Sequence, residues 1–282
     1  MRHSMKKGTA ARGRARVTAL SIASSDSAGG AGIQADLLTF AAHRVHGATV
    51  LVAATAQNTR GITAVEPLSP RFIAAQMNAV FPDLAPRAVK IGALVDAARV
   101  RAVARGLRRH RAAGVVLDPV LTATTGRRLL HPGALRDLRR ELLPLCDLVT
   151  PNRREAAALA GIPIRGDSDR RLAAGLIADQ GARAVLITGG DGRTTETRDL
   201  FFDGRFFTEF VGPRIRTRAV HGTGCTLSSA ITANLALGLP LEDAIARAIR
   251  YVREAISRGF FPGRGWGVLE HFPLPHRRGS FT

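Results

Sequence analysis

The chain has 282 residues, of which 45% are hydrophobic, and its mean hydropathy is +0.04. This composition is typical of a soluble globular protein, and the length allows one large domain or two small ones. No apolar run is long enough to span a bilayer, so we expect no membrane partner.

The formal net charge of +19 raises the possibility of nucleic-acid binding. The positive residues are nearly all arginine, with only three lysines, and they are scattered through every segment. Aromatic residues make up 5% of the chain, with one Trp and one Tyr, so a platform for stacking bases is hard to assemble. We expect a general attraction for polyanions but no specific nucleic-acid recognition.

Residues 1–16 are basic and rich in small side chains. They lack the apolar segment of a secretory signal, and we expect a disordered tail there, followed by one α/β domain over residues 17–282. The chain has two cysteines, Cys146 and Cys225, which are too few for a disulfide framework. A reducing, cytoplasmic location is therefore expected.

The first predicted strand, residues 17–23, is followed by a serine-rich turn and by Gly29, Gly30 and Gly32. A helix is predicted directly afterwards, over residues 33–43. This order is typical of a ligand-facing loop in an α/β fold. The glycine spacing differs from G-x-G-x-x-G, so we do not expect a dinucleotide site.

A second apolar strand, residues 48–56, ends on Gln57 and Asn58. Open α/β sheets bind ligands at the carboxyl ends of their strands, so these polar groups are candidates for ligand contacts. A loop that is merely capped by Asn58 explains the pattern equally well.

Further short strands alternate with helical segments, which predicts a mainly parallel sheet with helices on both faces. Strands are predicted at 89–92, 115–118, 148–150 and 184–188, helices at 69–80, 96–111, 132–143, 169–180 and 241–257, and a hairpin at 200–207. Another helix starts after Asn152, with Glu155 three residues further on. This spacing is close to a capping box, and capping alone is a sufficient explanation of both residues.

A glycine-rich segment, residues 221–230, precedes a run with apolar residues at helical spacing. Gly222 and Gly224 let backbone N–H groups approach a ligand, and a helix N-terminus favours negative charge. Cys225 lies on the expected first turn, where the same field lowers the pKa of a thiol. One segment thus offers an oxyanion hole and a base, although a glycine turn that caps an ordinary helix, with Cys225 as a small buried residue, is the simpler alternative.

Seven separated segments together resemble the ribokinase-like small-molecule kinases. They are residues 25–36, 55–59, 90–92, 117–120, 150–155, 188–190 and 221–226. Within that group the chain is similar to the hydroxymethylpyrimidine/phosphomethylpyrimidine kinases of thiamine biosynthesis, from about Thr18 to the C-terminal tail. The resemblance implies a ribokinase-like single domain, ATP and Mg²⁺ as cofactors, an aminopyrimidine alcohol as substrate, and a homodimer.

The resemblance also implies a role for each matching residue on the substrate side. Gly222, Thr223 and Gly224 stabilise the charge that develops during phosphoryl transfer, and Cys225 is the base beside the substrate hydroxymethyl group. Gln57 hydrogen-bonds the aminopyrimidine. Three more residues, Ser24, Ala31 and Asp36, fall in the pyrimidine pocket or beside it.

On the nucleotide side the resemblance assigns the phosphates and Mg²⁺ to Asp118, Asn152 and Glu155. The two carboxylates, Asp118 and Glu155, act on the metal through water, which suits the hydration of Mg²⁺. Thr188 and Gly190 lie at the position where these kinases normally carry a lysine and a glycine-rich turn.

Three positions depart from the family pattern: Thr188 replaces a lysine that reaches the phosphates, Ser24 replaces a glycine, and Ala93 replaces a methionine. The missing lysine puts the second phosphorylation in doubt, unless an arginine substitutes for it. The alternatives are a kinase of pyridoxal or pyridoxine, a catalytically weakened ligand-binding member of the fold, and a basic nucleic-acid binder.

Overall fold

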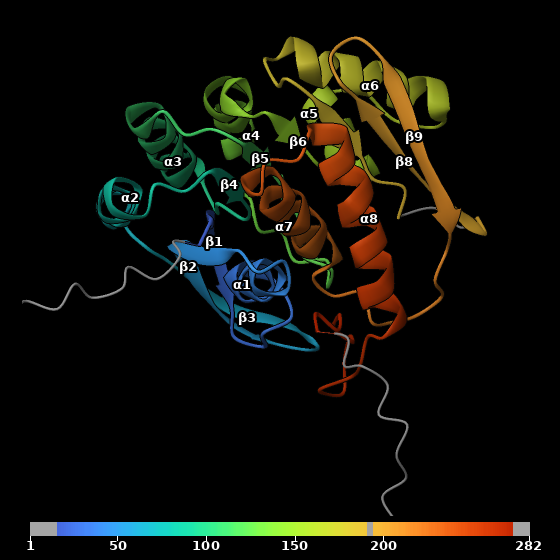
Figure 1. The fold of residues 1–282 in the computed structure, drawn as a ribbon, viewed down its shortest axis with the longest axis horizontal. Helices are drawn as coiled ribbons and strands as arrows, with labels where there is room; N and C mark the ends of the chain where they lie inside the picture. The colour runs from blue at the N-terminus through green and yellow to red at the C-terminus, as the bar shows by residue number, and fades with distance from the viewer. Residues whose placement is uncertain (1–15, 191–193, 273–282) are drawn as a thin grey trace, which may run out of the picture.

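The computed structural model describes residues 16–190 and 194–272 (Figure 1). The predicted basic tail, apart from Arg16, lies outside the described residues. Within these two ranges, no helix combines the length and the apolar character that a membrane crossing requires.

In the part of the chain that the structure describes, nine strands form one sheet in the order β3-β2-β1-β4-β5-β6-β7-β8-β9. Their bounds are β1 Thr18–Asp26, β2 His46–Asn58, β3 Gly61–Pro67, β4 Ala88–Ile91, β5 Val115–Leu117, β6 Leu148–Val149, β7 Val185–Ile187, β8 Glu196–Phe202 and β9 Phe207–Pro213. The pairs from β2 through β1, β4, β5 and β6 to β7 are parallel, and β3, β8 and β9 add antiparallel edges. The mainly parallel sheet is confirmed.

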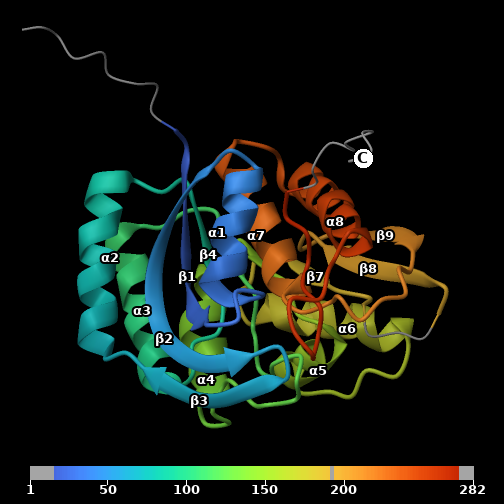
Figure 2. The same ribbon diagram turned by 90° about the horizontal axis from the view of Figure 1, so that it is seen from below.

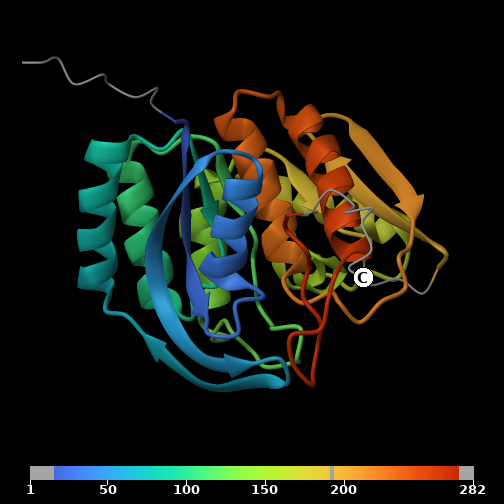
Figure 3. The ribbon, with the colours of Figure 1, turned by 60° about the horizontal axis from the view of Figure 1, so that its bottom comes forward.

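Helices cover both faces of the sheet, as predicted (Figures 2 and 3). Their bounds are α1 Gly32–Ala42, α2 Pro70–Leu84, α3 Ala97–His110, α4 Ala134–Asp137, α5 Arg153–Ala160, α6 Asp167–Asp179, α7 Thr223–Ala236 and α8 Leu241–Ser257. Helices α2 to α6 pack on one face over a core that includes Leu20 and Ile91. The opposite face packs against α1, α7 and α8 through residues such as Ala19 and Leu186.

The central strand β1 explains why both faces are buried. Its side chains alternate between the two faces, and nearly all of them are buried. Leu20 and Ile22 point into the apolar core under α2 and α3, whereas Ser21 points to α1 and bonds Asp36 there. A polar cluster therefore lies inside the molecule between the sheet and α1, directly beneath the carboxyl ends of the strands.

The segment after β2 differs from the prediction, because the chain forms a hairpin there. Asn58 Oδ1 accepts hydrogen bonds from the backbone N–H groups of Arg60 and Gly61, at 2.8 and 3.2 Å. This turn sends β3 back along β2 in antiparallel register. The capping explanation of Asn58 is therefore correct, and the short strand β3 was not predicted.

The predicted helix over residues 132–143 is also not continuous. It consists of α4, a π-helical turn over Leu138–Leu142 and a 3₁₀ turn over Leu143–Leu145. Pro144 lacks a backbone N–H and ends the regular helical hydrogen bonding there.

Candidate active site

A cavity of about 900 Å³ opens where the parallel strands end. This is the edge at which open α/β sheets bind ligands. The predicted site residues on its wall are Ser24, Ala31, Gln57, Asp118, Asn152, Glu155, Thr188, Gly190, Gly222, Thr223, Gly224 and Cys225. The fold thus brings together all but one of the predicted residues.

Two regions of the cavity differ in construction. We call the region beside the start of α1 the α1 half: it contains Ser24, Asp26, Ala31, Gln57 and His221. The region beside the start of α5 is called the α5 half: it contains Asn152, Glu155, Thr188, Gly190 and Arg214. The start of α7, with Cys225, also lines this cavity.

The glycine loop does open a helix, as predicted. Gly222 is the N-cap of α7 and has φ of +84°, a conformation that favours glycine. A Cβ atom at Gly222 would lie 1.9 Å from the carbonyl oxygen of Gly30, so the two glycine-rich loops touch backbone to backbone. A Cβ atom at Gly224 would lie 3.4 Å from Asp118 Oδ2. The first N–H groups of α7 thus lie at the cavity wall, where an anion is stabilised.

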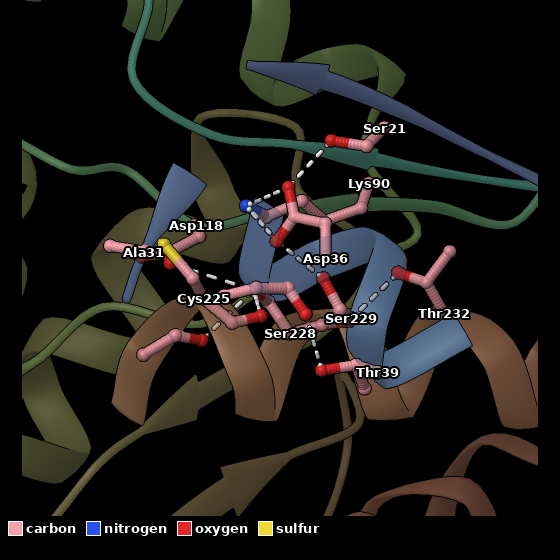
Figure 4. Close-up of polar contacts among 12 residues, drawn as sticks. Ser21, Ala31, Asp36, Thr39, Lys90, Asp118, Cys225, Ser228, Ser229 and Thr232 are labelled. Atoms are coloured by element: carbon pink, nitrogen blue, oxygen red, sulfur yellow. Dashed lines mark hydrogen bonds and ion pairs between the residues drawn. The ribbon is translucent and has the colours of Figure 1, made fainter. Parts of the chain in front are cut away.

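Cys225 is half-buried on the first turn of α7 (Figure 4). The pKa of its thiol is raised to about 12, mainly by burial; Lys90 opposes this rise, and the nearby carboxylates of Asp118 and Asp36 contribute to it. The predicted lowering of this pKa is therefore wrong for the free protein. The helix N-terminus and Lys90 do not outweigh the loss of water and two negative charges.

Asp36 is the predicted site residue that does not line the cavity. Its side chain is 0% exposed and lies beneath the site, between α1, α7 and the sheet (Figure 4). Both of its oxygens lie 2.9 Å from Lys90 Nζ, and the hydroxyls of Ser21 and Ser229 donate to it at 2.5 and 2.7 Å. Asp36 thus lies beneath the pocket and not on its wall, and its carboxylate oxygens are held by buried donors.

Lys90 is the cationic partner of this network and is itself 0% exposed. Burial lowers the pKa of Lys90, but the negative groups around it, first Asp36, outweigh burial and raise the pKa above its ordinary value. Lys90 also lines the cavity, so a fixed positive charge lies at its floor beside Cys225 and Asp118.

Asp118 is 5% exposed and follows β5 directly. The pKa of Asp118 is raised to about 6, mainly by burial; Lys90 opposes this rise and Asp36 contributes to it. Ser228 Oγ lies 3.5 Å from its carboxylate. A nearby cation stabilises the ionised form of a buried carboxylate such as this one.

Asn152 and Glu155 form the predicted capping box of α5. Asn152 Oδ1 accepts from the backbone N–H of Glu155, and Glu155 Oε2 accepts from that of Asn152, both at 3.0 Å. Glu155 Oε1 accepts a third hydrogen bond from the backbone N–H of Leu121, at 3.2 Å. Both oxygens of Glu155 already accept hydrogen bonds from backbone N–H groups. This carboxylate therefore suits a water-mediated contact with a metal better than a direct one.

The residues present fit one Mg²⁺ ion held mostly by water and phosphate. Asp118 supplies the buried negative charge, and Glu155 faces the same cavity. Among the described residues, no three His, Cys, Asp or Glu side chains gather into a metal cage. Mg²⁺ typically uses one or two carboxylates with phosphates and water, so this donor set is appropriate.

Two departures from the family pattern meet in the α1 half. Ser24 Oγ donates a hydrogen bond of 3.1 Å to the carbonyl oxygen of Ala93. The added hydroxyl is therefore satisfied by the backbone at the second altered position. This contact ties the end of β1 to the segment after β4.

Two residues of the site had no predicted role. His221 contacts Asp26 at 2.9 Å and Gln57 at 3.2 Å. Arg214 in the α5 half donates to four carbonyl oxygens, including those of Gly189 and Gly190. In a chain with so many arginines, nothing in the sequence distinguishes Arg214 from the others.

Comparison with known proteins shows the family of the chain. The profile of the phosphomethylpyrimidine kinase family matches residues 26–270. The chain belongs to this family. It is 51% identical over 257 residues to the hydroxymethylpyrimidine/phosphomethylpyrimidine kinase of Rhizobium meliloti, covering 90% of this chain and 96% of the relative. The corresponding kinase of Escherichia coli is 41% identical over 261 residues, covering 91% and 98%.

Solved structures show the same ribokinase-like fold. The pyridoxal kinase of Bacillus subtilis, in an ADP complex, has a TM-score of 0.85 and 34% identity, covering 91% of this chain and 97% of that one. The phosphomethylpyrimidine kinase of Clostridium difficile has a TM-score of 0.77 and 39% identity, covering 86% and 100%.

Proposed function

We propose that the protein transfers the γ-phosphoryl group of ATP to the hydroxymethyl group of 4-amino-5-hydroxymethyl-2-methylpyrimidine in thiamine biosynthesis. We further propose that it then phosphorylates the monophosphate to the diphosphate. The observation that carries the proposal is that one cavity holds the Gln57 amide, the start of α7 and Cys225. An amide offers the donor and the acceptor that an aminopyrimidine edge requires.

In this proposal the α1 half binds the ring and the α5 half binds the nucleotide. Gln57 bonds the aminopyrimidine, with Ser24 and Ala31 beside the ring. The backbone N–H groups of residues 222–225 stabilise the charge on the transferring phosphoryl group. This stabilisation is the main contribution that a protein makes to phosphoryl transfer.

Cys225 is proposed to take the proton of the substrate hydroxyl. The raised pKa of the thiol means that this role requires the thiol to lose its own proton in the substrate complex. Lys90 and the α7 N-terminus supply positive charge beside it for that purpose. The transition state is loose, so the hydroxyl needs little deprotonation before the phosphoryl group moves.

Mg²⁺ would be held by Asp118 and, through water, by Glu155, and it neutralises charge on the phosphates when bound. Asn152, Thr188 and Gly190 are proposed to border the nucleotide. Thr188 supplies no positive charge, but Arg154, Arg214 and Arg253 line the same cavity. We propose that arginine supplies part, but not all, of the positive charge of the missing lysine.

The second candidate is a kinase of pyridoxal. It is favoured by the likeness of the fold to the pyridoxal kinases of Bacillus subtilis and Staphylococcus aureus, at 34% and 31% identity. Relatives with higher identity, at 51% and 44%, are hydroxymethylpyrimidine/phosphomethylpyrimidine kinases, which favours the pyrimidine. We therefore propose pyridoxal phosphorylation as a side activity.

The test is a mass-resolved product assay with ATP, Mg²⁺ and hydroxymethylpyrimidine, run beside pyridoxal. The proposal predicts the monophosphate first and the diphosphate later. Turnover of pyridoxal without turnover of the pyrimidine would replace the proposal by the second candidate. Turnover of neither would indicate a ligand-binding member of the fold.

We also propose a homodimer in the cytoplasm. Support comes from the family resemblance for the dimer and from the free state of both Cys146 and Cys225 for a reducing compartment. Light scattering coupled to gel filtration tests the dimer, and a monomeric mass would contradict it.

A further inference from the structure

His221 joins the two glycine-rich loops of the site. It is 6% exposed and immediately precedes Gly222. Its Nε2 atom lies 2.9 Å from Asp26 Oδ2 and 3.2 Å from Gln57 Nε2. A Cβ atom at Gly30 would lie 2.6 Å from the His221 ring, so the imidazole packs directly on the loop before α1.

The surroundings of the ring determine which nitrogen carries the proton. The Nδ1 atom is buried and has no hydrogen-bond partner among the described residues. A proton on Nδ1, in either the neutral or the charged ring, would be a buried donor without an acceptor, which costs about 1–3 kcal/mol. A proton on Nε2 alone leaves Nδ1 as a buried acceptor without a donor, which is also unfavourable, so the groups around Nε2 decide the assignment.

The Asp26 carboxylate shows that the proton lies on His221 Nε2. Its carboxylate accepts from the backbone N–H groups of Ala28, Gly30 and Ala31, at 2.8 to 3.2 Å. Burial raises the pKa of Asp26, but the hydrogen bonds from His221 and the backbone outweigh burial and lower it. An ionised carboxylate only accepts hydrogen bonds, so His221 Nε2 must donate.

This assignment has a consequence for the Gln57 amide. Its Nε2 lies beside His221, and its Oε1 lies 3.2 Å from Thr55 Oγ1. The Thr55 hydroxyl, however, donates over the shorter distance of 2.9 Å to the carbonyl of Ser25. The oxygen and nitrogen of an amide are assigned from their partners. His221 Nε2 is a donor, and Thr55 Oγ1 is free to act as an acceptor. The Gln57 oxygen must therefore face His221 and the NH₂ group must face Thr55, which is the orientation given above turned by 180°.

We propose that His221 is a positioning residue whose Nε2–H, shared between Asp26 Oδ2 and the Gln57 amide, fixes that amide with Oε1 toward the imidazole and the NH₂ group toward Thr55. The backbone of Gln57 is already held, because its N–H and C=O groups both bond Ser27 Oγ at 2.7 Å. Only the amide remains free to turn. One lone pair and one N–H stay available, in a fixed order, for a ring that places an amino donor next to a nitrogen acceptor.

The choice of that ring rests on the proposed function, whereas the tautomer of His221 and the orientation of Gln57 do not. The first experiment is therefore ¹⁵N NMR of the histidine-labelled protein without substrate. The His221→Gln spectrum identifies the His221 signals by their loss. We expect a proton on Nε2. A ring protonated only on Nδ1 would overturn the proposal whatever the substrate is.

The second experiment compares His221→Leu with His221→Gln, whose amide nitrogen can occupy the place of Nε2. We expect the leucine variant to raise the KM for hydroxymethylpyrimidine by roughly tenfold, equivalent to about 1.4 kcal/mol, with little change in the KM for ATP. The glutamine variant should recover most of this loss. His46→Leu, a change at an exposed histidine that does not line the cavity, is the matched control and should leave both constants unchanged.

Equal KM values for the leucine and glutamine variants would overturn the positioning role. So would a parallel rise in the KM for ATP, which would indicate that His221 only supports the start of α7. Because the NMR experiment needs only the unsubstituted protein and the glutamine variant, the proposal stays testable if the leucine variant fails to fold. Failure of the pyrimidine assay alone contradicts the proposed function and not the tautomer.

Discussion

The α1 half and the α5 half of the cavity are held in different ways. In the α1 half, polar side chains bond one another as well as the backbone: His221 contacts Asp26 and Gln57 across separations of 195 and 164 residues. In the α5 half, polar side chains bond the backbone: Asn152 and Glu155 cap their own helix, and Arg214 binds carbonyl oxygens. A ring with a defined hydrogen-bond pattern needs fixed side chains, whereas a charged polyphosphate needs mainly backbone N–H groups and positive charge.

Beneath the start of α7 lies a third group of polar side chains, which is distinct from the two halves of the cavity. It is the buried network of Lys90, Asp36, Ser21 and Ser229. This network is continuous with the α1 half through α1 and is insulated from water. Substitutions near α1 and α7 should therefore have larger effects than substitutions in the α5 half.

The largest effect is expected for Cys225→Ala. Loss of the proposed base should lower kcat by roughly 10²–10⁴-fold, the range typical of general acid–base catalysis, with the fold intact. Steady-state kinetics with a parallel thermal melt measures this. Near-normal kcat would remove Cys225 from the base role, and Cys146→Ala, at the other cysteine, controls for a general effect of losing a thiol.

Lys90→Met should destabilise the protein strongly. It leaves the buried Asp36 carboxylate without its cation, and breaking a buried pair in this way costs about 3–5 kcal/mol. Urea unfolding measures the change, and Arg183→Met, which removes a surface pair with Asp147, is the control with an expected loss of about 0–1 kcal/mol. If the two variants lost equal free energy of unfolding, the buried pair of Lys90 and Asp36 would contribute no more to stability than a surface pair.

The alkylation of Cys225 by iodoacetamide should be slow and pH-dependent in the free protein. A pKa raised to about 12 means that the thiolate fraction is small at neutral pH and grows about tenfold per pH unit up to that value. Mass spectrometry of the modified peptide follows the rate from pH 7 to pH 10. A plateau near neutral pH would show a stable thiolate and contradict the raised pKa.

The smallest effect is expected in the α5 half. Thr188→Lys restores an ammonium near the phosphates and should accelerate the second phosphorylation more than the first, by roughly several-fold. Rates of monophosphate and diphosphate formation measure both steps. An unchanged second step would show that the arginines of the cavity already supply the needed charge.

The sequence could predict the features of the site that depend on residues close together in the chain. The capping box of Asn152 and Glu155 and the cap at Ser69 join residues three apart, so local spacing reveals them. Gly222 was predictable because its backbone conformation is intrinsic to glycine. The elements of the parallel sheet follow from the alternation of apolar strands and helices.

Contacts between distant residues could not be predicted in this way. The burial of Asp36 depends on Lys90, 54 residues away, and the pKa of Cys225 depends on carboxylates from α1 and β5. The local sequence shows only the helix N-terminus, which favours a thiolate. The carboxylates of Asp36 and Asp118 come from distant segments, so their effect on the pKa of Cys225 could not be predicted. The role of His221 likewise needs the three-dimensional arrangement, because nothing in its own segment points to Gln57.

The most direct test of the account is a competition between hydroxymethylpyrimidine and pyridoxal at equal concentrations. The ratio of the two products gives the ratio of the kcat/KM values. The account predicts a preference for the pyrimidine in the unsubstituted protein, reduced by roughly tenfold or more in Gln57→Leu because the amide that reads the ring is gone. A preference for pyridoxal, or a preference unchanged by Gln57→Leu, would contradict it.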